Sequence, residues 1–270
     1  IFIWTWISVS MMPIVFMITT SLKDTEIARQ MPPKWIFTPK FENYLTVLVG
    51  GEGYSQGFDR LMLNSIIVTV TSTVLCLIVA FPAALALSQP KFRKRKFLSS
   101  WILSTYMFPP IVAIIPIFIF AGKIQALDTY PVLAIPYAAF NLPIVIWILK
   151  SSIEQIPKEI EEAARVDGAN GWHYVSKILL PLAVPALATG AILSSILSWN
   201  DFLFAIFLTG GSPKLSVATT ALNFITGSGN QVYYGNNMTA SLIVSIPTLL
   251  VYLFLGRYFL RGMLAGSLKG

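Results

Sequence analysis

The chain has 270 residues, of which 55% are hydrophobic and 11% are charged, and its formal net charge is +7 at pH 7. Soluble domains usually carry about 25% charged residues, so this composition excludes an ordinary water-soluble protein and indicates an integral membrane protein. The mean hydropathy of +0.71 agrees with that interpretation. The positive charge is typical of the loops that membrane proteins leave in the cytoplasm, and this explanation is preferred to nucleic-acid binding.

A helix that crosses a bilayer needs about 20 predominantly apolar residues. Segments of this kind occur six times, at residues 1–20, 61–87, 97–122, 130–149, 178–208 and 239–260. The sequence therefore predicts an all-α membrane protein with six transmembrane helices and a single transmembrane domain over residues 1–270. The fifth segment is long enough to be tilted or broken near its outer end. The first begins at Ile1 without a Met, which we interpret as an incomplete N-terminus rather than a signal peptide.

The charges of the loops predict the orientation of the spans. Residues 91–96 carry five basic side chains and no acidic one, and the C-terminal tail carries Arg257, Arg261 and Lys269, again without an acid. Both segments are therefore expected in the cytoplasm. In residues 21–60 five basic side chains balance five acidic ones, which favours an external loop. We expect a multi-pass protein of a bacterial-type cytoplasmic membrane with both termini in the cytoplasm.

The cytoplasmic loop of residues 151–177 has the pattern of a helix, a tight turn and a second helix. Pro157 suits the start of a helix, and the glutamates that follow stabilise its positive end. Gly168 stands where a helix needs a left-handed terminator. Small side chains at Ala163 and Ala164 permit another surface to approach, so the loop is predicted to dock onto a partner. The alternative is an amphipathic helix on the lipid headgroups, although its acidic character argues against anionic lipids.

A spaced motif runs through this loop into the fifth span. Glu162, Ala163 and Ala164 are followed after three residues by Gly168, after nine more by Ile178, and then by Leu180 and Pro181. This spacing resembles the EAA signature of ABC import permeases at every fixed position. The resemblance implies a type I ABC importer permease fold, in which the loop forms coupling helices that sit in a cleft of an ATP-hydrolysing subunit. On that resemblance, the ATPase-coupling residues are Glu162, Ala163, Ala164, Asp167, Gly168, Leu180 and Pro181.

Other stretches resemble the second permease of carbohydrate importers of the maltose-transporter type. They are residues 20–23, 32–35, 42–44, 199–202 and 257–266. This resemblance implies alternating-access import of a sugar, expected to be a di- or oligosaccharide. It also implies as partners a related permease chain in a heterodimer, two ATP-binding cassette subunits and an extracytoplasmic solute-binding protein. ATP and Mg would be bound by the ATPase partners, and this chain would hold no cofactor.

Two alternative functions remain open from the sequence. The same architecture serves the import of glycerol phosphate or another small solute. A stand-alone channel or secondary carrier belongs to a different class, and it would leave the docking loop unexplained. The span interiors show neither buried acids nor buried bases, which favours a neutral cargo.

No pattern for catalysis is found. The one Gly-Lys pair is Gly122-Lys123, and Ile117 stands where a phosphate-binding loop needs its first glycine. His173 is the one histidine and has no cysteine or second histidine near it in the sequence, so no metal site is expected. We therefore predict a transport subunit that is not an enzyme, has no catalytic residue and binds no nucleic acid.

Polar and aromatic residues within the spans are candidates for the substrate pathway. Trp199, Asn200 and Asp201, at the outer part of the fifth span, offer an aromatic face and hydrogen-bonding groups that suit sugar rings. The alternative for these residues is an anchor at the membrane interface. Tyr106 and Asn141 are mid-span candidates on the same reasoning.

Overall fold

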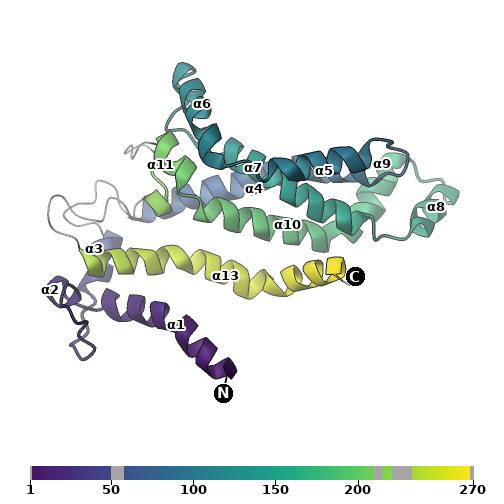
Figure 1. The fold of residues 1–270 in the computed structure, drawn as a ribbon. Coiled ribbons are helices and arrows are strands. Elements are labelled where there is room, and N and C mark those ends of the chain that lie inside the picture. Colours follow the sequence, from purple (N-terminus) through teal and green to yellow (C-terminus); the bar gives the residue numbers. More distant parts are fainter. Residues whose placement is uncertain (1, 50–57, 210–214, 221–232, 268–270) are drawn as a thin grey trace. The chain divides into compact units, whose positions relative to one another are not determined.

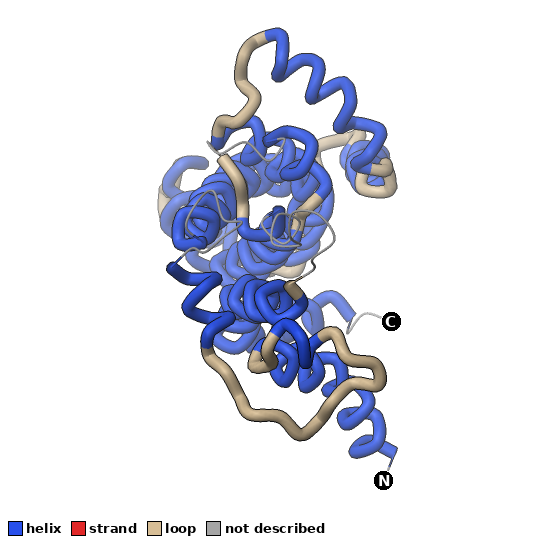
Figure 2. Tube along the Cα trace, turned by 90° about the vertical axis from the view of Figure 1, so that its left-hand side faces the viewer, coloured by secondary structure: helices blue, strands red, loops and turns tan. Residues whose placement is uncertain are grey.

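The structure is a computed structural model that describes residues 2–49, 58–209, 215–220 and 233–267, with side chains described as far as residue 254. The regular secondary structure of these residues is helical, with loops between the helices (Figure 2). Figure 1 shows the helices in chain order: α1 (Phe2–Ser21), α2 (Thr25–Ala28), α3 (Glu42–Val49), α4 (Phe58–Ser88), α5 (Arg95–Thr105), α6 (Pro110–Lys123), α7 (Tyr130–Ile153), α8 (Lys158–Val166), α9 (Gly171–His173), the π-helix η1 (Tyr174–Leu179), α10 (Leu180–Asn200), α11 (Leu203–Thr209) and α13 (Tyr234–Ser267).

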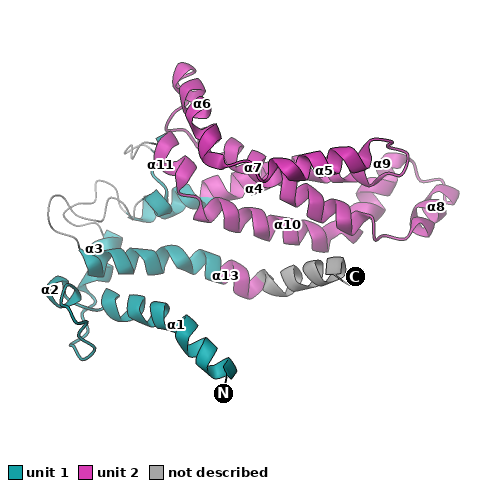
Figure 3. Ribbon diagram, viewed as in Figure 1, with its two compact units in different colours: residues 1–66, 209–249 teal, residues 67–208, 250–270 magenta. Residues whose placement is uncertain are grey.

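Contacts between residues divide the chain into two compact units (Figure 3). Unit 1 comprises residues 1–66 and 209–249. Unit 2 comprises residues 67–208 and 250–270. Unit 2 contains the loop and the motif that the sequence analysis singled out.

The core of unit 2 forms where α7 meets α4 and α10. Val145 of α7 is fully buried in one apolar cluster with Cys76 and Ala80 of α4. On α10, a methyl group added to Gly190 would lie 3.0 Å from a methyl carbon of Val145 and 3.5 Å from one of Leu77. Because helices in a membrane associate through close packing, small side chains at these crossings stabilise the bundle.

Five helices among the described residues are long and apolar enough to cross a membrane, namely α1, α4, α7, α13 and the continuous helix from Gly171 to Asn200. They correspond to five of the six predicted spans. The break after Asn200, where α11 follows as a separate helix, agrees with the expected interruption of the fifth span. In the predicted cytoplasmic tail, the side chains of Arg257 and Arg261, and all of Lys269, lie outside the described part of the chain.

The third predicted span differs from the expectation. Residues 97–122 were expected to form one helix, but α5 and α6 meet at an angle of 82°. Pro109 and Pro110 follow one another at the break, and neither has an N–H to donate to the preceding turn. The residue before a proline is also pushed away from helical geometry. The predicted span is therefore broken rather than continuous, because this proline pair interrupts the backbone hydrogen bonds of an otherwise apolar stretch.

Unit 1 is organised around Asn43 of α3. The Nδ2 group of Asn43 donates hydrogen bonds to the carbonyl oxygens of Ser21, at 2.7 Å, and Lys23, at 2.8 Å. The hydroxyl groups of Ser21 and Tyr44 are hydrogen-bonded at 2.9 Å. Carbonyl groups at the end of a helix have no partner within it, so α3 supplies these partners to the end of α1.

The start of α13 packs against the same residues. Thr239 is fully buried, and its hydroxyl lies within donating distance of the carbonyl oxygens of Ser21, at 3.4 Å, and of Gly235, at 2.9 Å. Unit 1 also contains an apolar cluster, to which α13 contributes two residues. The cluster is made of Val47, Phe58, Leu61, Ala218, Ala240 and Val244. The stretches of the sequence around residues 20–23 and 42–44 thus form one buried hydrogen-bonded cluster.

Replacing Gly235 by alanine is expected to destabilise unit 1. The added methyl group would lie 2.5 Å from Nδ2 of Asn43, which its two hydrogen bonds hold in place. Overpacking of this kind costs about 1–3 kcal/mol. The control is Gly122→Ala, whose methyl group would meet its nearest neighbour at 3.8 Å. Thermal unfolding of the purified membrane protein, followed by tryptophan fluorescence, should show a lower Tm for G235A than for G122A; equal values would contradict the role given to Asn43.

Candidate functional site

The predicted docking loop is a built structure in unit 2. The helix α8 starts directly after Pro157, with Glu159 and Glu161 in its first turn and Arg165 in its last. This distribution of charge suits the helix dipole at both ends. An ion pair one turn apart, 2.6 Å between Arg165 and Glu161, further stabilises the helix.

The turn after α8 follows the expectation for Gly168. Its φ of +79° lies in the left-handed region that disfavours side chains. The N–H of Gly168 donates to the carbonyl oxygen of Arg165, at 3.1 Å, and the N–H of Ala169 to that of Ala164, at 2.9 Å. This pair of bonds is a Schellman motif, which stops the helix and reverses the chain.

The second helical part begins with a cap and runs into the fifth span without a gap. The side-chain oxygen of Asn170 accepts a hydrogen bond from the N–H of His173, at 2.8 Å. The next six residues form the π-helix η1, and α10 follows with Pro181 in its first turn. Pro181 has no N–H to donate to the preceding turn. It stands just after the point where the wider π-helical turn ends.

One face of α8 is exposed and carries the motif. Glu162 and Ala163 are exposed on this face, and so is Val166, with 87% of its surface accessible. Across the turn, Trp172 is 79% exposed. Large apolar side chains that are exposed close together mark a surface that contacts another molecule. The sequence analysis missed Val166 and Trp172, because an apolar residue in a helical loop reads equally well as part of the core.

The remaining motif residues lie in different environments. Asp167 and Gly168 are exposed in the turn, and Leu180 and Pro181 are exposed at the start of α10. Ala164 is only 5% exposed, so it packs against its own chain. The two alanines were expected to share one contact face, and the structure places them on different sides of α8.

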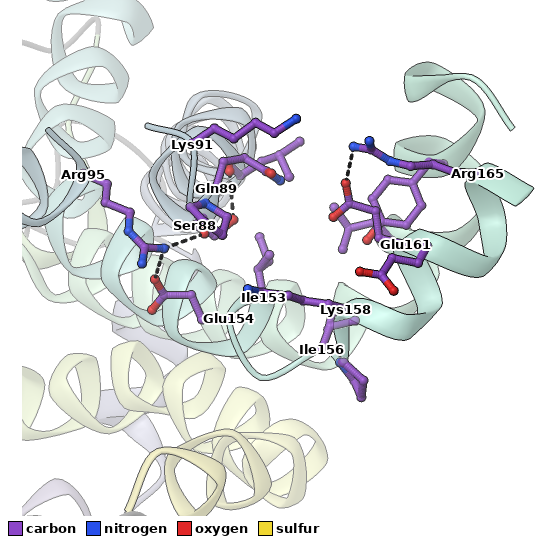
Figure 4. Close-up of a pocket in the computed structure, with 16 residues that line it drawn as sticks. Ser88, Gln89, Lys91, Arg95, Ile153, Glu154, Ile156, Lys158, Glu161 and Arg165 are labelled. Atoms are coloured by element: carbon purple, nitrogen blue, oxygen red, sulfur yellow. Dashed lines mark hydrogen bonds and ion pairs between the residues drawn. The ribbon is translucent and has the colours of Figure 1, made fainter. Parts of the chain in front are cut away.

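A cleft of about 500 Å³ lies between α8, the end of α7 and the turn from α4 to α5. Figure 4 shows the ion pair of Arg165 with Glu161 on one side of this cleft and the side chain of Arg95 on the other. Arg95 donates to the carbonyl oxygen of Ser88, at 3.1 Å, and lies 3.7 Å from Glu154. Arg95 therefore connects the end of α4 to the end of α7, next to the docking loop.

The candidate pathway residue Asn141 lies in the bundle core and is 6% exposed. Its amide donates to the hydroxyl oxygens of Ser198, at 3.0 Å, and Ser194, at 3.3 Å, on α10. Ser72 of α4 donates in turn to Ser198, at 3.0 Å. These hydrogen bonds link α4, α7 and α10. In a membrane, hydrogen bonds of this kind between helices contribute about 0.6 kcal/mol each.

The other pathway candidates are not brought together at one cavity. Trp199 is 7% exposed, whereas Asn200 is exposed and its amide donates to the carbonyl oxygen of Ile196 at 2.8 Å. Asp201 ends α10 and accepts a hydrogen bond from the N–H of Phe204, at 3.0 Å, in the first turn of α11. Tyr106 lies in the break between α5 and α6.

A second cavity, of about 650 Å³, lies inside that break. Its lining includes Trp101, Thr105, Phe108, Phe140 and Pro143. Aromatic rings and hydroxyl groups here resemble, in kind, the chemistry expected of a sugar pathway. Sequence analysis missed this site, because the angle between α5 and α6 creates it. Among the residues that the structure describes, no group of three or more His, Cys, Asp or Glu side chains is placed to hold a metal ion.

Comparison with known proteins agrees with this architecture. A putative ABC transporter permease protein of Caldicellulosiruptor sp. is 34% identical over 279 residues, covering 100% of this chain and 96% of the relative. The trehalose/maltose transport system permease protein MalG of Thermococcus litoralis is 31% identical over 97% of this chain and 92% of the relative.

A solved structure is similar over nearly the whole chain. It is the crystal structure of a bacterial ABC transporter involved in the import of the acidic polysaccharide alginate, with a TM-score of 0.73 and 27% identity over 96% of this chain and 94% of that chain. Residues 77–264 match the family model of binding-protein-dependent transport system inner membrane components. With its helical bundle and its exposed helix–turn–helix loop, the chain belongs to this family, the permease subunits of ABC transporters.

Proposed function

We propose that this chain is the transmembrane permease subunit of an ATP-driven, binding-protein-dependent importer whose cargo is a sugar, namely a di- or oligosaccharide. The observation that carries the proposal is the loop of α8 and Gly168, which holds the motif and presents Glu162, Ala163 and Val166 outward. The cargo class is supported by two relatives: one is named for trehalose and maltose, and the other imports alginate.

The assembly contains three further kinds of subunit. A second, related permease completes the pore as a heterodimer, two ATP-binding cassette subunits hydrolyse ATP, and an extracytoplasmic binding protein delivers the sugar. ATP and Mg are bound by the ATPase subunits, since this chain has no phosphate-binding loop. This chain contributes part of the pathway for the sugar and the connection between the ATPase subunits and the transmembrane helices.

Transport proceeds by alternating access. Closure of the ATPase pair moves the loop of α8, and α10 moves with its second part because α9 and η1 run into α10 without a gap. The exposed coupling residues are Glu162, Ala163, Asp167 and Gly168, together with Val166 and Trp172. Ala164 packs α8 against its own chain, and Leu180 and Pro181 begin α10, into which the loop runs.

The sugar pathway involves residues at the break in α5–α6 and at the end of α10. Trp199, Asn200 and Asp201 shape its outer mouth, and Tyr106 stands at the broken span beside the second cavity. Asn141 acts within the bundle, through the helix contacts that it makes in this conformation.

The chain lies in a bacterial-type cytoplasmic membrane with both termini in the cytoplasm. Counting α5 and α6 as one broken span gives six spans. With six spans, the basic residues 91–96 and the loop of α8 share the cytoplasmic side, where the ATPase subunits bind.

Purified assemblies in liposomes should show ATPase activity that rises with one sugar and its binding protein. The panel contains neutral disaccharides, acidic oligosaccharides and glycerol phosphate. Stimulation by glycerol phosphate alone would remove the carbohydrate assignment and keep the importer. If no ATPase subunit copurified with the chain, a channel or secondary carrier would replace the proposal.

Glu162→Lys is expected to abolish sugar-stimulated ATPase activity and uptake, while the chain still inserts into the membrane. Reversal of charge on the exposed face of α8 replaces an attraction by a repulsion at the subunit contact. The matched control is Glu26→Lys, which makes the same change on an exposed residue of α2 in unit 1. ATP-dependent uptake equal in the two variants would refute the coupling role of α8.

Gly168→Ala should weaken coupling through the turn itself. A left-handed conformation costs about 1–2 kcal/mol for a residue with a Cβ, although no atom lies within 4 Å of the added methyl group. Gly168→Asn should recover much of the loss, because asparagine tolerates this conformation. Gly171→Ala is the control, since it also meets open space and its φ is not positive. The measurement is transport per ATP hydrolysed, and identical ratios in G168A and G171A would rule out the turn as the determinant.

A further inference from the structure

The connection between α2 and α3 exposes large apolar side chains. Met31 and Ile36 are each 90% exposed, Phe41 is 68% exposed and Trp35 is 54% exposed. All four lie within eleven residues of unit 1. Apolar groups gathered in this way indicate a surface that is covered in the working protein.

This connection is fixed against the end of α1. The rings of Trp35 and Phe16 meet edge to face, with centroids 6.5 Å apart. The ammonium group of Lys23 lies 5.8 Å from each of these two ring centroids and 5.1 Å from that of Phe37. Only 2% of Lys23 is exposed, so the three rings and their surroundings cover the cation.

Two further contacts hold the far side of the connection. The N–H of Lys40 donates to the carbonyl oxygen of Leu22, at 2.8 Å. The Lys40 ammonium lies 2.6 Å from Asp24 and lowers the pKa of that carboxyl group. The connection therefore has a defined position relative to the last turn of α1, beside α2 in Figure 1.

With α1 across the bilayer, its 20 residues match the thickness of the hydrocarbon core, and its end falls where lipid tails give way to headgroups. The helix α1 has 20 residues and is apolar, and its spanning stretch is not buried in the protein. Phe16 is five residues from the end of α1, or about 7–8 Å along its axis. Trp35 packs on Phe16 and so lies at the depth where tryptophan gathers in membrane proteins.

We propose that residues 31–41, which we call the interfacial loop, lie in the headgroup region of the lipid leaflet at the end of α1. Lipid acyl chains then cover Met31 and Ile36. Lys34 is exposed beside Trp35, and its long side chain can reach a lipid phosphate group. The loop thus fixes the depth of α1 by binding phospholipid.

The backbone of the interfacial loop fits this depth and no greater one. Irregular backbone is not tolerated in the hydrocarbon core, because its polar groups would have no partner there. Three of its eleven residues, Pro32, Pro33 and Pro39, have no N–H that needs an acceptor. A lipid surface is favoured over a soluble partner because Trp35 lies along the side of a spanning helix. The depth does not depend on the proposed cargo or orientation.

Spin labels at Ile36→Cys and Met31→Cys test the proposal in the complete transporter in liposomes. Cys76→Ser first removes the one cysteine of this chain, and the partner subunits are made cysteine-free. Glu26→Cys, on an exposed polar position of α2, is the control. Collisions with oxygen, which enters lipid, are compared with collisions with a water-soluble nickel complex.

We expect the oxygen-to-nickel collision ratio at residues 31 and 36 to exceed that at residue 26 several-fold. Equal ratios at the three sites would place the loop in water and overturn the proposal. Protection from both reagents in the complete transporter would show that a partner subunit covers the loop instead. Protection that appears only when the binding protein is added would show a docking surface for that protein. These last two results also overturn lipid binding, but they leave the importer function intact.

Discussion

Backbone hydrogen bonding in a solvent without water limits what this chain can form. Each N–H and carbonyl group inside a bilayer needs a partner within the protein, which favours helices throughout the spans. The break between α5 and α6 respects this rule, because the N–H groups of Tyr106, Met107 and Phe108 each donate three residues back, at 3.1 Å. At the break after α10, Asp201 supplies the partner for Phe204. The chain therefore changes direction at two kinds of place: where prolines have no N–H that needs an acceptor, and where a side chain accepts the hydrogen bond of a backbone N–H.

The elements that depend on local interactions were predictable from the sequence. Hydrophobic length located the spans, and the spacing of the motif located the turn at Gly168, whose hydrogen bonds join residues at most five apart. The break in the third span could also have been predicted from Pro109 and Pro110 alone. Two adjacent prolines favour a break, whereas the continuous apolar stretch around them favours one helix, and the two signals have no common scale.

The faces that the spans turn toward one another were not predictable. A helix that is apolar all round has no polar face to show its rotation. Asn141 meets Ser194 and Ser198, which are 53 and 57 residues away, and nothing local distinguishes that contact from a cargo site. The exposure of Val166 and Trp172 was not predictable either, because it depends on which sides of α8 and α9 meet the bundle.

The contact of Asn141 with α10 has a consequence for how the bundle moves. Ser194 and Ser198 are one helical turn apart, so the amide has acceptors at two successive levels of the same helix. When α7 and α10 slide along each other by part of a turn, one hydrogen bond lengthens while the other shortens. A shift of that size would therefore still leave the buried amide with an acceptor, which avoids the cost of an unsatisfied polar group.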